Sequence, residues 1–308
     1  MKPSSEIRYL ASGLIDREEW DSWVRGSANR RIYSSSLFLD IFSPGWEALV
    51  AGNGDVFMPL TRNRKWGITY LFQPIFVQQL GCFYREGISC NTKEFLDRAH
   101  GLFRFADISM NEMNDPGECG YRSVKMTNYL LNLDRPYEQM VAGYDKNTLR
   151  NIQKAGRLRI ELRPHNMAGD IVRLFAGSAG RNYPNIRRVN YIRLQNLLEK
   201  GLDEGFIEIR GAFSTRGRIL AALCMLEDYD RYVFYFSANT EEGRKYGAMF
   251  MLLDSFLKQY AGKGRVFDFN GSVNPGTARF YMGFGARAVI YHRIRMNRLR
   301  FPANRLKR

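Results

Sequence analysis

The order of elements in the C-terminal third of the chain limits the fold more than any other feature. Residues 206–239 read as three strands broken by "STRG" and "EDYD", and "KYGAMFMLLDSFLKQYAGKG" has the spacing of an amphipathic helix that ends at glycine. The strand "RVFDFNGS", a short helical piece and a last strand follow. Short turns join antiparallel strands, whereas a crossover helix joins parallel ones. The order therefore predicts an α/β (α+β) fold with mixed, mainly antiparallel sheets flanked by helices.

The first half of the chain also mixes helix and strand. Residues 14–25 have helical spacing, with Trp20 and Trp23 three residues apart on one face. The apolar runs "ALVA" and "VFMPL" flank an Asn-Gly pair, which indicates a hairpin. We expect an N-terminal domain over residues 1–135, a C-terminal domain over 136–292 and a basic tail over 293–308.

The balance of charge favours an anionic partner. The 308 residues carry a formal net charge of +15, and residues 291–308 hold seven Arg or Lys and no acid. This tail is either a solvated end or an attachment to nucleic acid or to an anionic membrane surface. No apolar run reaches the roughly 18 residues that span a bilayer, and the first residues do not resemble a signal peptide. We therefore expect a cytoplasmic protein, with the tail as a means of peripheral attachment at the inner membrane face.

Metal chemistry is not indicated. The four cysteines form no C-x-x-C pair and the three histidines are scattered along the chain. The sequence therefore predicts free thiols and no metal site.

A glycine-rich turn ahead of the C-terminal helix is the first candidate site. The link "TEEGRKYGA" places glycines and the cations Arg244 and Lys245 at a helix N-terminus, where free N–H groups attract anions. Gly247 would let the backbone approach a phosphate closely. The alternative is an ordinary exposed turn, because the spacing matches neither a P-loop nor a dinucleotide fingerprint.

The strand and helix that follow offer two titratable groups. Asp268, with Asn270 beside it, ends a core strand, where ligands collect in α/β sheets. Its carboxylate could orient or deprotonate an amine, or it could bond the amides of the next turn. Tyr281 could act as a general acid toward a leaving thiolate, or it could pack in the core.

A basic helix opens the second half of the chain. Lys146, Arg150 and Lys154 are four residues apart and share one helical face. They form either a solvated face or a binding surface for an anionic substrate.

These segments together resemble a known family. The stretch "SANTEEGRKYGAMFMLLDSFLKQYAGKGRVFDFNGSVNPGTARFYMGFGA" resembles the C-terminal core of the GNAT-like acyltransferases of the Fem type. The shared motifs are an Arg-x-x-Gly-Ala helix start, Asp-Phe-x-Gly and Phe-x-x-Gly-Phe-Gly. The basic helix and the strands of the first half resemble the same family more loosely.

The resemblance implies two tandem GNAT-like domains and a donor site. Arg244, Gly247 and Ala248, with Lys245, would hold the phosphates of acetyl-CoA or another acyl-CoA, although Met249 stands where the usual signature has Gly or Ala. Bridge-forming Fem enzymes commonly carry lysine where this chain has Tyr281. A phenol suits protonation of a thiolate, so the sequence favours a thioester donor over charged tRNA.

We therefore expect an N-acyltransferase that moves an acyl group from an acyl-CoA-type thioester to an amine, with Asp268 and Tyr281 as catalytic residues. The amine would belong to a small molecule or to a cell-wall or lipid precursor. One alternative is an aminoacyl-tRNA-dependent peptidoglycan bridge transferase of the Fem type. The other is a non-catalytic binding module on the same fold, because fold alone does not imply function.

Overall fold

The computed structural model describes residues 6–272 and 274–299. Within them the chain forms two compact units: unit 1 contains residues 6–126 and 290–299, and unit 2 contains residues 127–289. We expected boundaries after residues 135 and 292. In the structure both divisions between the units fall inside strands that run from one unit into the other. The residue pattern of such a continuous strand gives no sign of a domain boundary.

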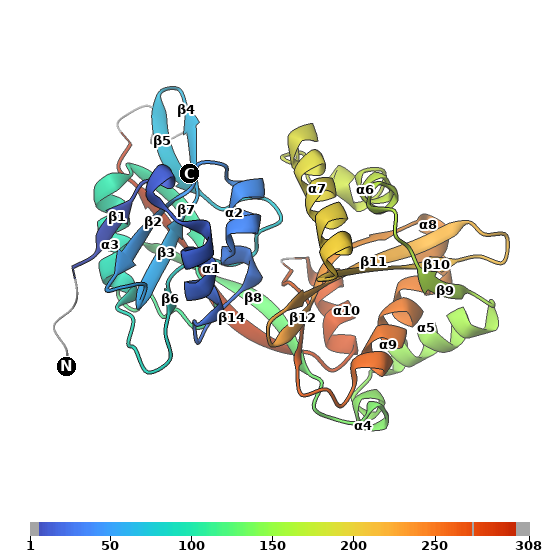
Figure 1. The fold of residues 1–308 in the computed structure, drawn as a ribbon. Helices are drawn as coiled ribbons and strands as arrows, with labels where there is room; N and C mark the ends of the chain where they lie inside the picture. Colours follow the sequence, from blue (N-terminus) through green and yellow to red (C-terminus); the bar gives the residue numbers. More distant parts are fainter. Residues whose placement is uncertain (1–5, 273, 300–308) are drawn as a thin grey trace. The chain divides into compact units, whose positions relative to one another are not determined.

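Unit 1 mixes short helices with two groups of strands (Figure 1). Its helices are η1 (Ser12–Leu14), α1 (Arg17–Arg25), η2 (Ile32–Ser34), α2 (Ser36–Phe42) and α3 (Thr92–Leu102). Its strands are β1 (Arg8–Leu10), β2 (Glu47–Ala51), β3 (Val56–Leu60), β4 (Arg62–Lys65), β5 (Ile68–Phe72), β6 (Phe83–Tyr84) and β7 (Phe105–Ser109), with the first part of β8 (Arg122–Asn132) and the end of β14 (Arg287–Asn297).

The predicted helix and hairpin of unit 1 are confirmed. Asp16 caps α1 by accepting from the backbone N–H groups of Glu18 and Glu19, and Trp20 is fully buried. Strands β2 and β3 pair antiparallel in a sheet of order β1-β2-β3-β6, and both are buried along their length. A second group of strands has the order β4-β5-β7-β14.

Residues 293–297, which we expected in the basic tail, are part of a strand instead. Residues Arg293–Asn297 of β14 pair antiparallel with β7, and Ile294 and Met296 are buried. Arg293 and Arg295 both bind the carboxylate of Asp107. Basic residues here alternate with apolar ones, which is the period of a strand with one buried face. Residues 300–308 of the expected tail lie outside the described residues.

Unit 2 carries most of the helices. They are α4 (Tyr137–Ala142), α5 (Lys146–Arg157), α6 (Ala168–Ala176), η3 (Ala179–Asn182), α7 (Arg188–Glu204), α8 (Glu241–Tyr246), α9 (Ala248–Tyr260) and α10 (Pro275–Gly283). The strands are β9 (Glu161–Pro164), β10 (Ile207–Phe213), β11 (Ile219–Asp228), β12 (Arg231–Asn239) and β13 (Val266–Asp268), with the end of β8 and the start of β14.

The sheet of unit 2 has the order β8-β13-β12-β11-β10-β9. All of its neighbouring strands run antiparallel except β12 and β13, which are joined through α8 and α9. Helices α5, α9 and α10 lie on one face of this sheet, and α6 and α7 on the other (Figure 1). The prediction of a mainly antiparallel α/β fold with a crossover helix is confirmed.

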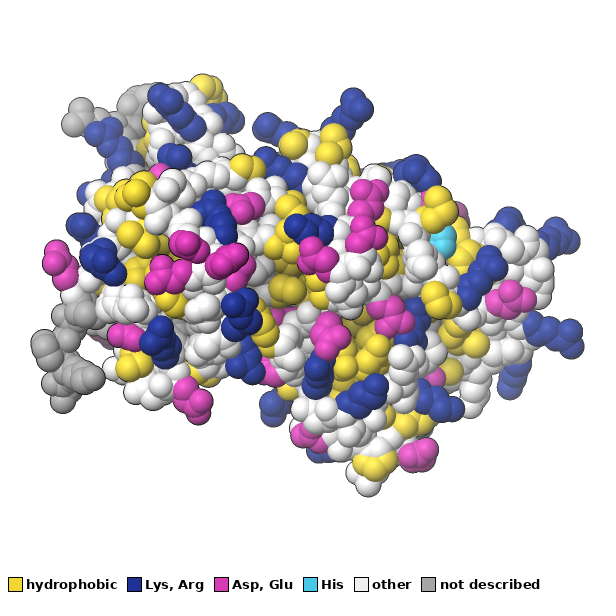
Figure 2. All heavy atoms as spheres, in the orientation of Figure 1, with side chains coloured by type: hydrophobic (Ala, Val, Ile, Leu, Met, Phe, Trp, Pro, Cys, Tyr) yellow, Lys and Arg dark blue, Asp and Glu magenta, His cyan; other side chains and the backbone are white. Residues whose placement is uncertain are grey.

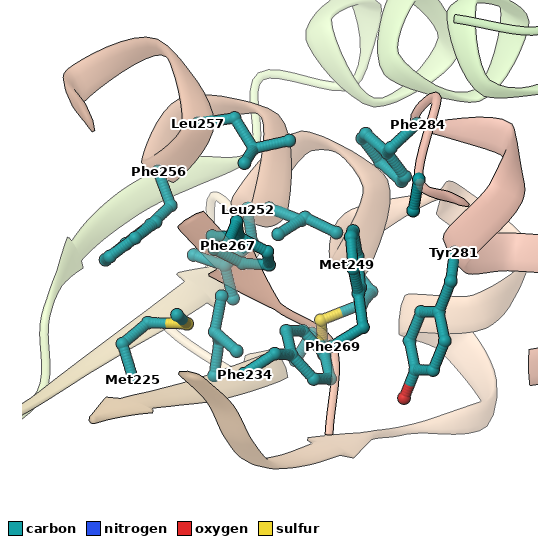
Figure 3. Packing of buried hydrophobic residues seen from close by; sticks show 14 of the residues in the cluster. Met225, Phe234, Met249, Leu252, Phe256, Leu257, Phe267, Phe269, Tyr281 and Phe284 are labelled. Atoms are coloured by element: carbon teal, nitrogen blue, oxygen red, sulfur yellow. The ribbon is translucent and has the colours of Figure 1, made fainter. Parts of the chain in front are cut away.

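The core of unit 2 lies between α9 and the sheet. The predicted apolar stripe of α9 is buried, including Leu252, Leu253 and Phe256. Figure 3 shows Phe267 and Phe269 between this helix and the strands, with Tyr281 beside them. Removal of so much apolar surface from water is the main favourable term in folding this unit.

Candidate active site

The middle of the unit 2 sheet splits where β12 and β13 separate. The two strands pair only at Arg231–Val233 of β12, although β12 continues to Asn239. A bulge at Tyr235 interrupts the pairing of β12 with β11, because Phe234 pairs with Met225 but Phe236 pairs with Cys224. Beyond Val233, no described strand covers this edge of β12. Backbone polar groups on such an edge are available to a ligand.

The split leads directly into the predicted glycine-rich turn. Thr240 caps α8 by accepting from the N–H of Gly243, and Gly247 ends α8 and begins α9 at φ +75°. A Cβ atom at Gly247 would lie 2.7 Å from the backbone oxygen of Asn151 on α5, so no other residue fits without strain. Among the described residues, no acceptor bonds the first N–H groups of α9, those of Ala248 and Met249. These groups and the helix dipole favour an anion.

The split, the turn and α10 line one open pocket of about 350 Å³. Three elements contribute its lining. They are the end of β12 (Phe234, Ser237, Asn239), the α8–α9 region (Gly243, Arg244, Gly247, Met249, Phe250) and α10 (Gly276, Thr277, Phe280, Tyr281). Mostly apolar walls with a few polar groups are typical of ligand sites.

The structure brings Tyr281 into the same pocket as the turn. The residue is 6% exposed, and its ring packs 4.6 Å from that of Phe269. Figure 3 shows the Tyr281 ring extending from α10, with its hydroxyl directed away from Phe284. Burial is the main cause that raises the pKa of the Tyr281 phenol well above its usual value, and Tyr183, Asp268 and Tyr129 raise it further. The phenol is therefore protonated at neutral pH, the state that a general acid needs.

Asp268 ends β13 as predicted, but its carboxylate does not line the pocket. It is 3% exposed, and its Oδ2 accepts from Nη1 of Arg231 at 2.8 Å. Its Oδ1 accepts from the side chain of Asn128 at 3.0 Å and from the N–H of Asn270 at 2.8 Å. These contacts favour the alternative we considered, in which Asp268 bonds the turn. They do not favour a general base, and its catalytic role stays a prediction.

Asn270 connects Asp268 to the bulge. It has φ +61°, which is uncommon outside glycine, and its side chain donates to the backbone oxygen of Tyr235 at 3.2 Å. Asn270 does not line the pocket. Asp268 and Asn270 thus hold the backbone where β12 departs from β13.

The residues expected at the donor site lie on both sides of the turn. Arg244 lines the pocket, and its Nη1 donates to the backbone oxygen of Asn239 at 3.0 Å. Lys245 is exposed and Ala248 is buried, and neither lines the pocket. Met249, at the position where the usual signature has Gly or Ala, lines it instead.

The predicted basic stripe lies on the exposed face of α5. Lys146, Arg150 and Lys154 are exposed, and no described carboxylate pairs with any of them. Arg150 donates to the side chain of Asn147. The stripe does not line the pocket.

The sequence analysis missed most of the polar pocket lining. Ser237, Asn239 and Thr277 line it. The buried Oδ1 of Asn239 has no hydrogen-bond partner among the described residues, which a bound ligand could supply. A sequence signal for Ser237 and Asn239 was present: the apolar strand ends in the polar residues "SANT", directly before the glycine-rich turn. No group of three or more metal-binding side chains occurs in the described parts of the chain.

Comparison with known proteins identifies the fold. Residues 144–280 match the family model of the acetyltransferase (GNAT) domain. A search of curated proteins found no match. The structure is similar to that of FemX, with a TM-score of 0.66 and 11% identity over 95% of this chain and 98% of FemX.

Two further structures share the fold at low identity. L-PGS from Bacillus licheniformis has a TM-score of 0.56 and 13% identity, over 94% of this chain and 95% of L-PGS. The N-myristoyltransferase of Saccharomyces cerevisiae, solved with bound myristoyl-CoA, has a TM-score of 0.50 and 10% identity, over 96% of this chain and 84% of that enzyme. The fold predicted from the resemblance is confirmed: residues 144–280 match an acetyltransferase (GNAT) domain, and the chain shares the fold of FemX.

Proposed function

We propose that unit 2 transfers an acyl group from a coenzyme A-type thioester to an amine. One observation carries this proposal: a single pocket joins an anion-attracting helix start to a buried, protonated phenol. A thioester donor needs a site for its phosphates at one end and a proton for its thiolate at the other.

The donor would lie along the split in the sheet. Its phosphates would accept from the N–H groups of Ala248 and Met249, with Arg244 as countercharge. Its amide-containing arm would bond the uncovered edge of β12 near Ser237 and Asn239. Phe250 and Phe280, whose ring centroids are 4.8 Å apart, would supply apolar contact.

The chemistry then needs one positioned acid. The amine nitrogen attacks the thioester carbonyl carbon, the carbon–sulfur bond breaks, and its electron pair leaves with the sulfur. Tyr281 would give its proton to this thiolate and become a phenolate. The attacking amine would release one proton to solvent, and solvent would return one proton to the phenolate. Most of the barrier reduction would come from positioning the two reactants and from a backbone N–H of β12 near the bulge that polarises the carbonyl.

In this account Asp268 is a positioning residue. It fixes the N–H of Asn270, and Asn270 in turn holds the carbonyl of Tyr235 at the bulge. The ion pair with Arg231 keeps the carboxylate in place. Asp268 would therefore act on the reaction through the shape of β12.

The comparisons support the donor class. The model that matches residues 144–280 describes acetyltransferases, and the myristoyltransferase of similar fold was solved with an acyl-CoA. We propose acetyl-CoA or a longer acyl-CoA as the donor. The acceptor would be an amine on a small molecule or on a cell-wall or lipid precursor.

A transfer assay tests the proposal. Acyl-CoA is incubated with a panel of amines, and release of the free thiol is followed with a thiol reagent. We expect Tyr281→Phe to lower kcat by about 100-fold or more, as loss of a general acid does. Tyr129→Phe is the matched control, because Tyr129 is buried beside Tyr281 but does not line the pocket. Equal rates for both variants would refute the role of Tyr281.

The basic stripe of α5 favours aminoacyl-tRNA as a second candidate donor. Three exposed cations on one helical face, with no described acidic partner, suit a polyanion. If tRNA is the donor, its affinity falls steeply as the salt concentration rises. Replacement of Lys146, Arg150 and Lys154 by Gln should then make the slope of log affinity against log salt concentration less steep by about three. An unchanged salt dependence would exclude the stripe as a tRNA contact.

A further inference from the structure

The hairpin of β4 and β5 in unit 1 exposes a tryptophan at its tip. Trp66 is 71% exposed, whereas Trp20, Trp23 and Trp46 are buried. Tryptophan carries more apolar surface than any other side chain, and proteins usually remove most of it from water. Trp66 therefore leaves in water an apolar surface that the other three tryptophans bury.

The turn itself gives no reason for a tryptophan. Lys65 pairs with Ile68, so Trp66 and Gly67 form a two-residue turn, with φ values of +51° and +74°. Such turns favour Asn-Gly or Asp-Gly, because a bulky residue is strained at positive φ. The hairpin thus keeps an unfavourable residue at its most exposed point, as is found at functional sites.

Positive charge surrounds this tryptophan. Arg64 and Lys65 are exposed, and Lys65 Nζ lies 4.4 Å from the centre of the Trp66 ring. No described carboxylate pairs with either cation, whereas Arg62 pairs with Glu47 farther from the tip. The segment from residue 61 to 72 contains no acid. Figure 2 shows basic and hydrophobic side chains together at the end of this hairpin.

We propose that the β4–β5 hairpin docks on an anionic phospholipid bilayer, with Trp66 at the level of the headgroups. Tryptophan favours this interface because its ring is apolar and its N–H is polar. Arg64 and Lys65 would lie against lipid phosphates, as basic residues near an anionic membrane surface do. This inference does not depend on the proposed function.

A lipid surface fits the tip better than single-stranded nucleic acid. Nucleic acid binds to successive aromatic rings on which several bases stack. Here the nearest aromatic residue of the hairpin, Tyr70, packs against Phe72 and Phe105 and is half-buried. A single protruding ring between cations is the arrangement of an interfacial anchor.

The fluorescence of Trp66 provides a direct test. Full-length protein is mixed with vesicles of phosphatidylcholine, or of equal parts phosphatidylcholine and phosphatidylglycerol. Because the other tryptophans are buried, a blue shift of the emission and quenching by brominated lipid report on Trp66. We expect both with the anionic vesicles, together with cosedimentation of the protein.

Three variants make the test specific. Trp66→Ser should lose the blue shift and most of the cosedimentation, and Leu14→Ser, which changes an equally exposed apolar residue, should keep both. The double change Arg64→Gln with Lys65→Gln should weaken binding to anionic vesicles by about 25-fold, from about 1 kcal/mol per cation. Circular dichroism checks that each variant is folded.

Three outcomes would overturn the proposal. One is an unshifted Trp66 emission with anionic vesicles. Another is cosedimentation of Trp66→Ser equal to that of the wild type, which would place the membrane contact elsewhere in the chain. The third is quenching of Trp66 by single-stranded RNA but not by lipid.

Discussion

Replacement of Asp268 separates a positioning role from a chemical one. The carboxylate and Arg231 form an ion pair whose side chains are 4% and 7% exposed, with nitrogen and oxygen 2.8 Å apart. Asp230 also lies 3.8 Å from Nε of Arg231, but its side chain is 53% exposed. Loss of the buried partner of such an ion pair costs about 3–5 kcal/mol. We therefore expect Asp268→Ala to destabilise unit 2 by that amount.

The effect is large enough for a thermal melt of the full chain. For a unit of this size, about 3–5 kcal/mol corresponds to a fall in Tm of about 10 °C. Asp268→Asn should be destabilised too, because it keeps the acceptor for Asn270 but loses the charge opposite Arg231. The double variant Asp268→Leu with Arg231→Met should recover much of the loss, because it removes both charges at once.

Kinetics complete this test. If Asp268 positions the bulge, the activity that remains in Asp268→Asn should follow the amount of folded protein. If Asp268 is instead a general base, Asp268→Asn should melt like the wild type and lose about 100-fold or more in kcat. That second result would show that the buried contacts of Asp268 do not define its role.

Two further predictions concern the pocket. Gly247→Ala should destabilise the chain by about 1–2 kcal/mol, because alanine is strained at the positive φ of this residue. The clash of the added Cβ with the backbone oxygen of Asn151 should destabilise it further. Denaturant unfolding gives the free energy of unfolding of this variant and of the control Gly205→Ala. Gly205 also has a positive φ, +80°, but nothing lies within 4 Å of its Cβ position. Equal losses of stability in the two variants would contradict the clash. For Tyr281, the raised pKa of the phenol means that the stability contributed by this group is fully present below a pH of about 10, the usual pKa of tyrosine. This contribution is lost as the pH rises above the usual phenol pKa toward the raised one, because over that range Tyr281 ionises in the unfolded chain but not in the folded one. Between about pH 9 and about pH 11, on either side of the usual phenol pKa, the free energy of unfolding of Tyr281→Phe should depend less on pH than that of the wild type. An unchanged dependence would contradict the burial of the Tyr281 side chain.

The sequence predicted the fold well where local signals agree with packing. The apolar stripe of α9 and the glycine-rich turn before it placed the crossover helix correctly, because both depend on neighbouring residues. The strand at Arg293–Asn297 was missed, since its basic residues concealed the alternation with Ile294 and Met296. Arg293 and Arg295 pair with Asp107, which lies 186 and 188 residues earlier in the chain, so no local pattern indicates this contact.

The candidate site was predictable only in part for the same reason. Arg244, Gly247 and Tyr281, which the resemblance pointed to, line one pocket, and their roles stay predictions. No local signal indicated that Asp268 faces Arg231 or that β12 bulges at Tyr235, because both depend on which strands are neighbours. The sequence pattern of an Asp at a strand end does not distinguish a carboxylate that faces a ligand from one that faces a buried cation.

Calorimetric titration with acetyl-CoA and with a longer acyl-CoA shows whether the pocket of unit 2 binds a thioester donor. Wild-type protein is compared with Arg244→Ala and with Lys245→Ala, whose side chain is exposed but does not line the pocket. We expect micromolar binding of at least one acyl-CoA to the wild type. Binding should be about tenfold weaker in Arg244→Ala, because a charged hydrogen bond is lost, and little changed in Lys245→Ala. No binding of either acyl-CoA to the wild-type protein would contradict the proposed thioester donor.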